Sequence, residues 1–178
     1  SKTVGIKHLH CMRAIIMAGG KGTRFTPLKP LAEVCGYPLF YFPYRLALEF
    51  AEEVYIAVTP SSPLLFLDLP KVVTSGRGYE WDVVEAVRVV GTPALVLPAD
   101  SLVPRHAIEA LISSCKSSIC TLKTRGEYTG VSLWNSLDLG DYVDIESVFP
   151  IINVNTLQDY LTAKNKCREF LGDSWEEY

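Results

Sequence analysis

The feature that most constrains this chain is a short apolar run that stops at a glycine-rich turn. Residues 14–17 are apolar, and glycines and cations follow at once. Glycines lack a Cβ, so their backbone N–H groups can approach phosphate oxygens closely, and successive N–H groups form a concave anion site. We therefore predict a phosphate-binding loop made of Ala18, Gly19, Gly20, Lys21, Gly22, Thr23 and Arg24, with Lys29 as a further cation.

The spacing of this loop distinguishes it from two common phosphate-binding motifs. Its three glycines lie within four positions, unlike the dinucleotide-binding fingerprint, and no Gly-Lys-Ser/Thr closes it as in a Walker A loop. A purely structural turn remains the alternative, because glycine-rich turns often only begin a hairpin or a helix.

The composition is that of an ordinary globular protein. The chain has 178 residues, 48% apolar and 21% charged, and we expect an N-terminal extension over 1–12 and a single domain over 13–178. The net charge of −3 gives no basic field for nucleic acid. No apolar run is long enough to span a bilayer, and the first residues lack the apolar core of a signal peptide. We expect a cytoplasmic protein.

The five cysteines form no recognisable metal-binding pattern. No C-x-x-C pair occurs, and the closest two, Cys115 and Cys120, have four residues between them. Structural zinc sites prefer tighter pairs, so we expect none, whereas disulfide bonding is left open.

Strands and helices alternate along most of the chain. Apolar runs predict strands at 13–17, 53–58, 71–74, 94–97, 118–123, 130–134 and 151–154. Helical spacing predicts helices at 38–49, 79–90, 104–115 and 156–170, with Pro104 at the first helical position. This order is typical of the α/β class, with a mostly parallel sheet covered by helices on both faces.

Three polar segments directly follow three of these strands. They are the glycine loop, a second glycine turn at 75–78, and Asp100. Parallel α/β sheets bind ligands at the carboxyl ends of their strands, so we predict one site at this edge.

Asp100 is a candidate magnesium ligand. A carboxylate just after a buried strand is costly without a partner. Mg²⁺ bridging to phosphate would supply one, because it often uses only one or two protein carboxylates. An N-cap for the following helix is the alternative.

The second glycine turn is a candidate site for a base or a ribose. Asp82 or a backbone carbonyl would accept hydrogen bonds from the N1–H and amino groups of guanine. A plain helix start, with Asp82 as an acid favoured by the helix dipole, stays open. The predicted nucleotide-binding residues of this segment are Thr74, Ser75, Gly76, Gly78, Tyr79 and Asp82.

The run A-G-G-K-G-T-R, followed by Lys29 and Pro30, resembles the signature of the MobA-like nucleotidyltransferases. Residues 29–36 and 74–82 are most similar to the archaeal GTP:adenosylcobinamide-phosphate guanylyltransferases. Residues 152–159 resemble a tail shared with the molybdenum-cofactor guanylyltransferases. The resemblance implies a Rossmann-like three-layer sandwich of the nucleotide-diphospho-sugar transferase type. It also implies GTP as donor, Mg²⁺, and a phosphorylated acceptor in cobalamin biosynthesis.

The resemblance also implies roles for the cations. Lys29 would stabilise charge at the α-phosphate, and Lys21 and Arg24 would grip the β- and γ-phosphates. The acceptor phosphate is mostly a dianion near pH 7, so no general base is needed. No second metal carboxylate is evident. Candidates are Asp141, Asp144 and Glu146, which we interpret instead as an acidic surface loop.

Other functions stay open. The same loop would serve molybdopterin, a sugar phosphate or another phosphorylated metabolite as acceptor, and a non-catalytic nucleotide-binding protein is a further alternative. Oligomeric state also stays open, including a homodimer, because Trp134, Trp175 and residues 40–42 suit either a core or an interface.

Overall fold

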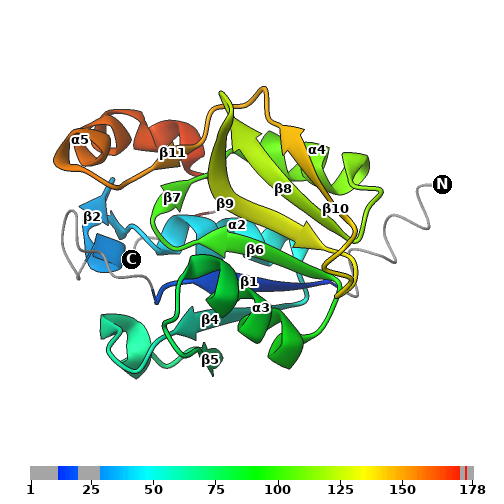
Figure 1. Cartoon of the computed structure of the whole chain (residues 1–178). Helices are drawn as coiled ribbons and strands as arrows, with labels where there is room; N and C mark the ends of the chain where they lie inside the picture. Colours follow the sequence, from blue (N-terminus) through cyan, green and yellow to red (C-terminus); the bar gives the residue numbers. More distant parts are fainter. Residues whose placement is uncertain (1–11, 20–28, 173–174, 176–178) are drawn as a thin grey trace.

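A seven-stranded sheet forms the centre of the computed structural model, which describes residues 12–19, 29–172 and 175 (Figure 1). The strand order is β10-β8-β9-β6-β1-β4-β5. Only β9 runs against the others within this sheet, because it pairs antiparallel with both β6 and β8. The predicted mostly parallel sheet is confirmed. Its strands are β1 (Arg13–Met17), β4 (Glu53–Val58), β5 (Lys71–Val73), β6 (Ala94–Pro98), β8 (Ile119–Thr124), β9 (Glu127–Trp134) and β10 (Tyr142–Glu146).

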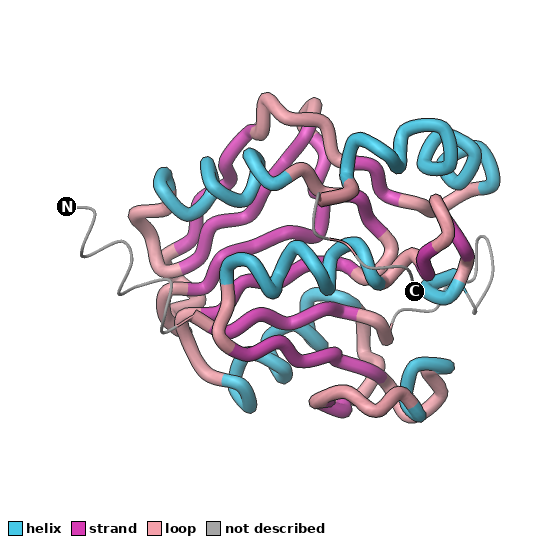
Figure 2. Tube along the Cα trace, turned by 180° about the vertical axis from the view of Figure 1, so that it is seen from behind, coloured by secondary structure: helices cyan, strands magenta, loops and turns pink. Residues whose placement is uncertain are grey.

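Helices cover both faces of this sheet. In β1, Ala14 and Ile16 pack in one apolar cluster with α2 (Tyr41–Phe50) and α4 (Arg105–Ser114). The alternate residues Ile15 and Met17 pack in a second cluster with α3 (Tyr79–Val90). Alternation of side chains along a strand therefore divides one apolar run between two cores. The opposite views of Figures 1 and 2 show the resulting three layers, as predicted.

Shorter elements gather at the carboxyl edge of the parallel strands (Figure 1). A hairpin of β2 and β3, a ribbon of β7 and β11, and α5 share a third apolar cluster. Their bounds, with those of the 3-10 turns, are η1 (Lys29–Leu31), β2 (Glu33–Val34), β3 (Tyr37–Pro38), η2 (Pro63–Phe66), β7 (Ser101–Leu102), β11 (Ile152–Asn153), α5 (Leu157–Lys166) and η3 (Cys167–Phe170).

Two predicted helix starts are wrong. Residues 38–40 do not begin α2, because Pro38 is held in the hairpin opposite Glu33. The turn of this hairpin puts Cys35 and Gly36 at positive φ. Pro104 precedes α4 as its N-cap residue and is not its first helical residue.

The end of the chain also differs from its prediction. The segment predicted as one helix over 156–170 is α5, capped by Thr156, followed by the 3-10 turn η3. The acidic residues Asp141, Asp144 and Glu146 do not belong to a simple loop, because the edge strand β10 covers 142–146.

Several side chains considered for an interface are part of the chain's own core. Trp134, Phe40 and Phe42 are buried, and Trp175 packs its ring on those of Tyr37 and Phe42. A homodimer stays a prediction, as does the cytoplasmic location. Within the described parts of the chain, every helix is too short or too polar to traverse a lipid bilayer.

The structure answers the open question about the cysteines with two disulfides. Cys35 in the β2–β3 turn is joined to Cys167 at the start of η3, 132 positions later. Cys115 and Cys120 are joined across a separation of 5. No cluster of three or more metal-binding side chains occurs among the residues that the structure describes.

The two disulfides are expected to differ in their contribution to stability. A disulfide restricts the unfolded chain, and more so when it closes a longer loop. The double variant Cys35→Ser/Cys167→Ser is therefore expected to lose roughly 5 kcal/mol of unfolding free energy. The same relation predicts about 2 kcal/mol for Cys115→Ser/Cys120→Ser, because that loop is short. Urea unfolding of the oxidised proteins measures both, and equal losses would contradict the loop-length argument.

Candidate nucleotide-binding site

Gly19, where the predicted phosphate loop begins, and the second glycine turn both approach Thr59, the residue that follows β4. A Cβ on Gly19 would lie 2.8 Å from Thr59 Cγ2, and one on Gly76 would lie 3.3 Å from the same methyl group. Gly76 also has a φ of +80°. Glycine is therefore required at both positions, by close approach at Gly19 and by conformation at Gly76. The start of the predicted loop and the second turn thus lie at the same edge of the sheet.

Residues after β4 hold the end of β1 in place, a role that the sequence analysis missed. Ser62 Oγ donates a buried hydrogen bond of 3.1 Å to the carbonyl of Ala18, and Thr59 Oγ1 donates one of 3.4 Å to that of Gly19. The only sequence signal was a polar stretch directly after a strand. Gly20, Lys21, Gly22, Thr23 and Arg24 lie outside the described residues.

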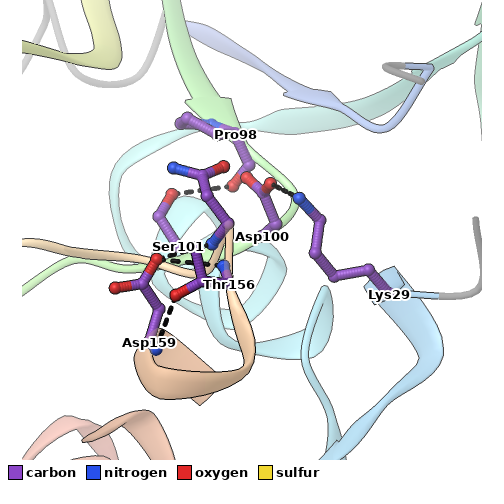
Figure 3. Close-up of polar contacts among 7 residues, drawn as sticks. Lys29, Pro98, Asp100, Ser101, Thr156 and Asp159 are labelled. Carbon is purple, nitrogen blue, oxygen red and sulfur yellow. Dashed lines mark hydrogen bonds and ion pairs between the residues drawn. The ribbon is translucent and has the colours of Figure 1, made fainter. Parts of the chain in front are cut away.

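Lys29 and Asp100 form an ion pair at this edge (Figure 3). The distance from Lys29 Nζ to Asp100 Oδ2 is 2.6 Å, and the two side chains are only 10% and 24% exposed. Lys29 begins η1, and Asp100 lies in the turn between β6 and β7. A buried carboxylate needs a partner, and the partner of Asp100 is Lys29, which is itself a residue of the predicted site. The alternative role as a helix cap is wrong, because Pro104 precedes α4.

The C-terminal segment supports Asp100 through its backbone. Val154 N–H donates to the carbonyl of Asp100 at 2.9 Å, beside the pairing of β11 with β7. Directly after this contact, Thr156 and Asp159 form a reciprocal capping box that begins α5 (Figure 3). The tail at 152–159 therefore places a helix start next to the predicted metal ligand.

The second glycine turn is held by two carboxylates of α3. Asp82 Oδ1 accepts from the N–H groups of Gly76 (3.0 Å) and Arg77 (3.2 Å), and Asp82 is 5% exposed. Glu85 accepts from Ser75 through both its backbone N–H and its hydroxyl. These hydrogen bonds lower the pKa of Glu85, with a smaller contribution from the Arg77 charge. Asp82 therefore shapes the turn, a role that differs from the direct base contact predicted for it.

Thr74 is buried and hydrogen-bonded to the sheet. Its N–H donates to the Val58 carbonyl at 2.7 Å, and only 2% of its surface is exposed. Gly78 has a φ of +127° and precedes α3 as its N-cap residue. Both residues thus fix the geometry of the turn.

Tyr79 connects this turn to β9. Its hydroxyl donates to the Gly130 carbonyl at 2.5 Å. Although 41% of the Tyr79 surface is exposed, desolvation of the hydroxyl, and secondarily the Asp100 charge, raise its pKa well above the ordinary value. A Cβ on Gly130 would lie 2.6 Å from Pro98 Cγ, so β9 approaches β6 closely here. Tyr79 therefore links the second glycine turn, where we predict the base, to the antiparallel strand β9.

The acidic residues near the end of the sheet have structural partners. Asp144 contacts Lys123 and accepts from the Tyr128 hydroxyl. Asp141 accepts from Ser118 N–H, and Glu146 accepts from Gly126 N–H. These contacts stabilise the edge of the sheet, and Asp100 remains the one predicted metal carboxylate among the described residues.

Comparison with known proteins agrees with this arrangement. The model of the protein family described as "MobA-like NTP transferase domain" matches residues 14–171. The chain belongs to the MobA-like NTP transferase family. This membership confirms the family resemblance inferred from the glycine loop.

One curated relative is an adenosylcobinamide-phosphate guanylyltransferase of Methanocaldococcus jannaschii. It is 36% identical over 101 residues, which cover 50% of this chain and 52% of that protein. The match thus spans about half the length of the relative.

Solved structures support the fold. A putative glucose-1-phosphate thymidylyltransferase from Bacillus anthracis superposes with a TM-score of 0.70 at 16% identity, covering 94% of this chain and 98% of that one. The inositol-1-phosphate CTP transferase from T. maritima gives 0.67 at 14% identity, covering 91% and 98%. At this identity the likeness shows a shared fold.

Replacement of Tyr79 by phenylalanine tests the link to β9. We expect Tyr79→Phe to lose about 1–2 kcal/mol at pH 7, because the Gly130 carbonyl loses its donor. The unfolded chain releases a tyrosine proton near pH 10, which the folded protein retains, so folding stability falls above that pH in the wild type. The deficit of the variant should therefore shrink above pH 10.

Urea unfolding at pH 7 and at higher pH measures this deficit. Tyr142→Phe is the matched control, since Tyr142 is 66% exposed on β10. A Tyr79→Phe deficit that stays constant up to pH 11 would contradict a retained proton.

Proposed function

We propose that this protein transfers GMP from GTP to a phosphorylated acceptor, adenosylcobinamide phosphate, with release of pyrophosphate. The donor and the acceptor are taken from the curated relative, an adenosylcobinamide-phosphate guanylyltransferase matched over half its length. The observation that carries the proposal is the Lys29–Asp100 pair at the edge where Gly19 and the second glycine turn approach Thr59. A cation beside a carboxylate that can bind a metal ion suits a site for a triphosphate.

The reaction needs charge stabilisation more than proton transfer. An oxygen of the acceptor phosphate bonds to the α-phosphorus of GTP, and the bond from that phosphorus to the bridging α–β oxygen breaks. Pyrophosphate leaves with the electron pair. Because the acceptor is mostly a dianion near pH 7, it attacks without a general base. Positioning and fixed charges supply the rate.

Lys29 is the described residue best suited to this task. Its ammonium group is held at the sheet edge by Asp100, and a phosphate that enters the site would share or take over this contact. Lys21 and Arg24 are proposed to hold the β- and γ-phosphates.

Asp100 is proposed to hold Mg²⁺. Its carboxylate fits, because it is partly exposed at the sheet edge, and magnesium commonly takes one or two carboxylates together with phosphate oxygens. When bound, Mg²⁺ supplies positive charge that neutralises the phosphates.

The proposed function is tested by calorimetric titration with GTP, ATP, CTP and UTP in the presence of Mg²⁺, followed by pyrophosphate release with adenosylcobinamide phosphate. Selective GTP binding and acceptor-dependent release are expected. Release with molybdopterin or a sugar phosphate instead would assign a different acceptor. Binding without release for any acceptor would indicate a non-catalytic nucleotide-binding protein.

Lys29→Ala is expected to lower kcat by about 100-fold or more, the usual cost of one transition-state contact. The measurement is steady-state pyrophosphate release. Lys116→Ala is the control, because this exposed lysine lies before β8 at the opposite end of the strands. Wild-type turnover in Lys29→Ala would exclude the proposed role.

Asp100→Asn is expected to move the magnesium titration of activity to higher concentration. The shift should be at least the 10–100-fold that loss of an outer-shell partner costs. Asparagine retains an oxygen that can accept from Lys29. The exposed residue Asp68 provides the control variant Asp68→Asn. An unchanged titration would leave Asp100 only as the partner of Lys29.

A further inference from the structure

We infer that Asp82 and Glu85 determine base specificity by accepting hydrogen bonds from the backbone N–H groups of the Ser75–Gly76–Arg77 turn. Only the carbonyl oxygens of the turn then remain for a base, and they favour a base edge that donates hydrogen bonds. Guanine has such an edge. This inference rests on the proposed function and deepens it, because it assigns the choice of donor nucleotide to two residues that need not touch the base.

The donors of the turn are fully used. Ser75 N–H donates to Glu85 Oε2 at 3.1 Å, and the next two N–H groups, of Gly76 and Arg77, donate to Asp82 Oδ1 at 3.0 and 3.2 Å. Asp82 is buried and cannot turn outward without breaking both contacts. The backbone of three successive residues therefore offers no free N–H group.

The carbonyl oxygens of the same turn accept no hydrogen bond from the residues that the structure describes, and residues 75–77 are all exposed. A carbonyl can only accept a hydrogen bond. The backbone of this turn is thus a row of acceptors, and a ligand that binds along it must bring donors.

The turn lies where the base of a bound nucleotide is expected. Gly76 and Gly19 both pack against the Thr59 methyl group, so the turn adjoins the start of the phosphate loop. A nucleotide with its phosphates at that loop can extend its base toward residues 75–77.

The hydrogen-bonding edge of guanine matches such a turn better than that of adenine. Guanine presents an N1–H and an adjacent amino group, which are donors in neighbouring positions. Adenine presents its N1 lone pair beside a single amino donor, so its N1 would oppose a carbonyl oxygen that the N1–H of guanine would satisfy. A site built on hydrogen bonds discriminates strongly when a polar group is left unpaired or opposed. A turn whose N–H donors are already used therefore disfavours adenine relative to guanine.

The test is calorimetric titration of the intact protein with GTP, ITP and ATP in the presence of Mg²⁺. The wild type should bind GTP best, then ITP, which lacks the amino donor, then ATP. Asp82→Ala frees two N–H donors and should reduce the ratio of the ATP to the GTP dissociation constant at least tenfold. Asp82→Asn keeps an oxygen for both N–H groups and should retain the ratio.

Two further variants make the test robust. Glu85→Ala frees the Ser75 N–H at a residue that is less buried than Asp82, so folding is less at risk, and it should move the ratio in the same direction. Glu80→Ala is the matched control, since Glu80 shares the first turn of α3 and its charge without a contact to the turn. Its ratio should equal that of the wild type.

The outcomes separate this inference from the proposed function. Equal weakening of GTP and ATP in Asp82→Ala and Glu85→Ala would overturn the inference, because the carboxylates would then be only structural. A wild type that does not prefer GTP would instead overturn the proposed function.

Discussion

The carboxyl edge of this protein depends on the contact between one buried ammonium group and one carboxylate. Lys29 is almost fully enclosed, and a lysine in such surroundings is unfavourable unless its charge is met. Asp100 meets it at 2.6 Å. The pair fixes η1 against the turn after β6, and the β11 and α5 region then packs behind that turn. In the proposed complex a phosphate would pair with the Lys29 ammonium group, and magnesium would pair with the Asp100 carboxylate.

Carboxylates elsewhere at this edge hold loops by accepting backbone N–H groups. Asp82 and Glu85 do so in the second glycine turn, and Asp159 does so at the start of α5. Each such bond removes a donor from the set that a ligand can use. Rigidity and recognition at this edge thus arise from the same contacts, because the groups that stay unpaired are those left for binding.

Local patterns in the sequence predicted the elements that depend on local physics. The runs of β1, β4 and α3 are long, periodic and clearly ended, and their observed bounds agree with the prediction. The strands β2, β3 and β7 have two residues each and were not predicted, whereas their partner β11 lies within the strand predicted at 151–154. The edge strand β10 is largely exposed and lacks the apolar signal of a buried strand. Disulfide partners 132 positions apart leave no local trace.

The residues of the candidate site could be predicted from the sequence better than the contacts that they make with one another. Asp100 and Lys29 were each identified by residue type and position, but their mutual pairing arises from the fold. The sequence offered Asp82 or a backbone carbonyl as the acceptor for the base, and in the structure Asp82 accepts two N–H groups of the glycine turn while Glu85 accepts a third. Thr59 and Ser62 were missed, because a polar residue after a strand is too common to mark a role.

The Cys35–Cys167 bond closes nearly the whole sheet into one covalent ring. Every element from β3 to α5 lies between the two cysteines. Exposed loop tips are where proteases cut, and residues 137–140 form such a tip before β10. A single cut there leaves two pieces that this disulfide still joins, so the piece that carries β10 and α5 is released only after a reductant opens the ring.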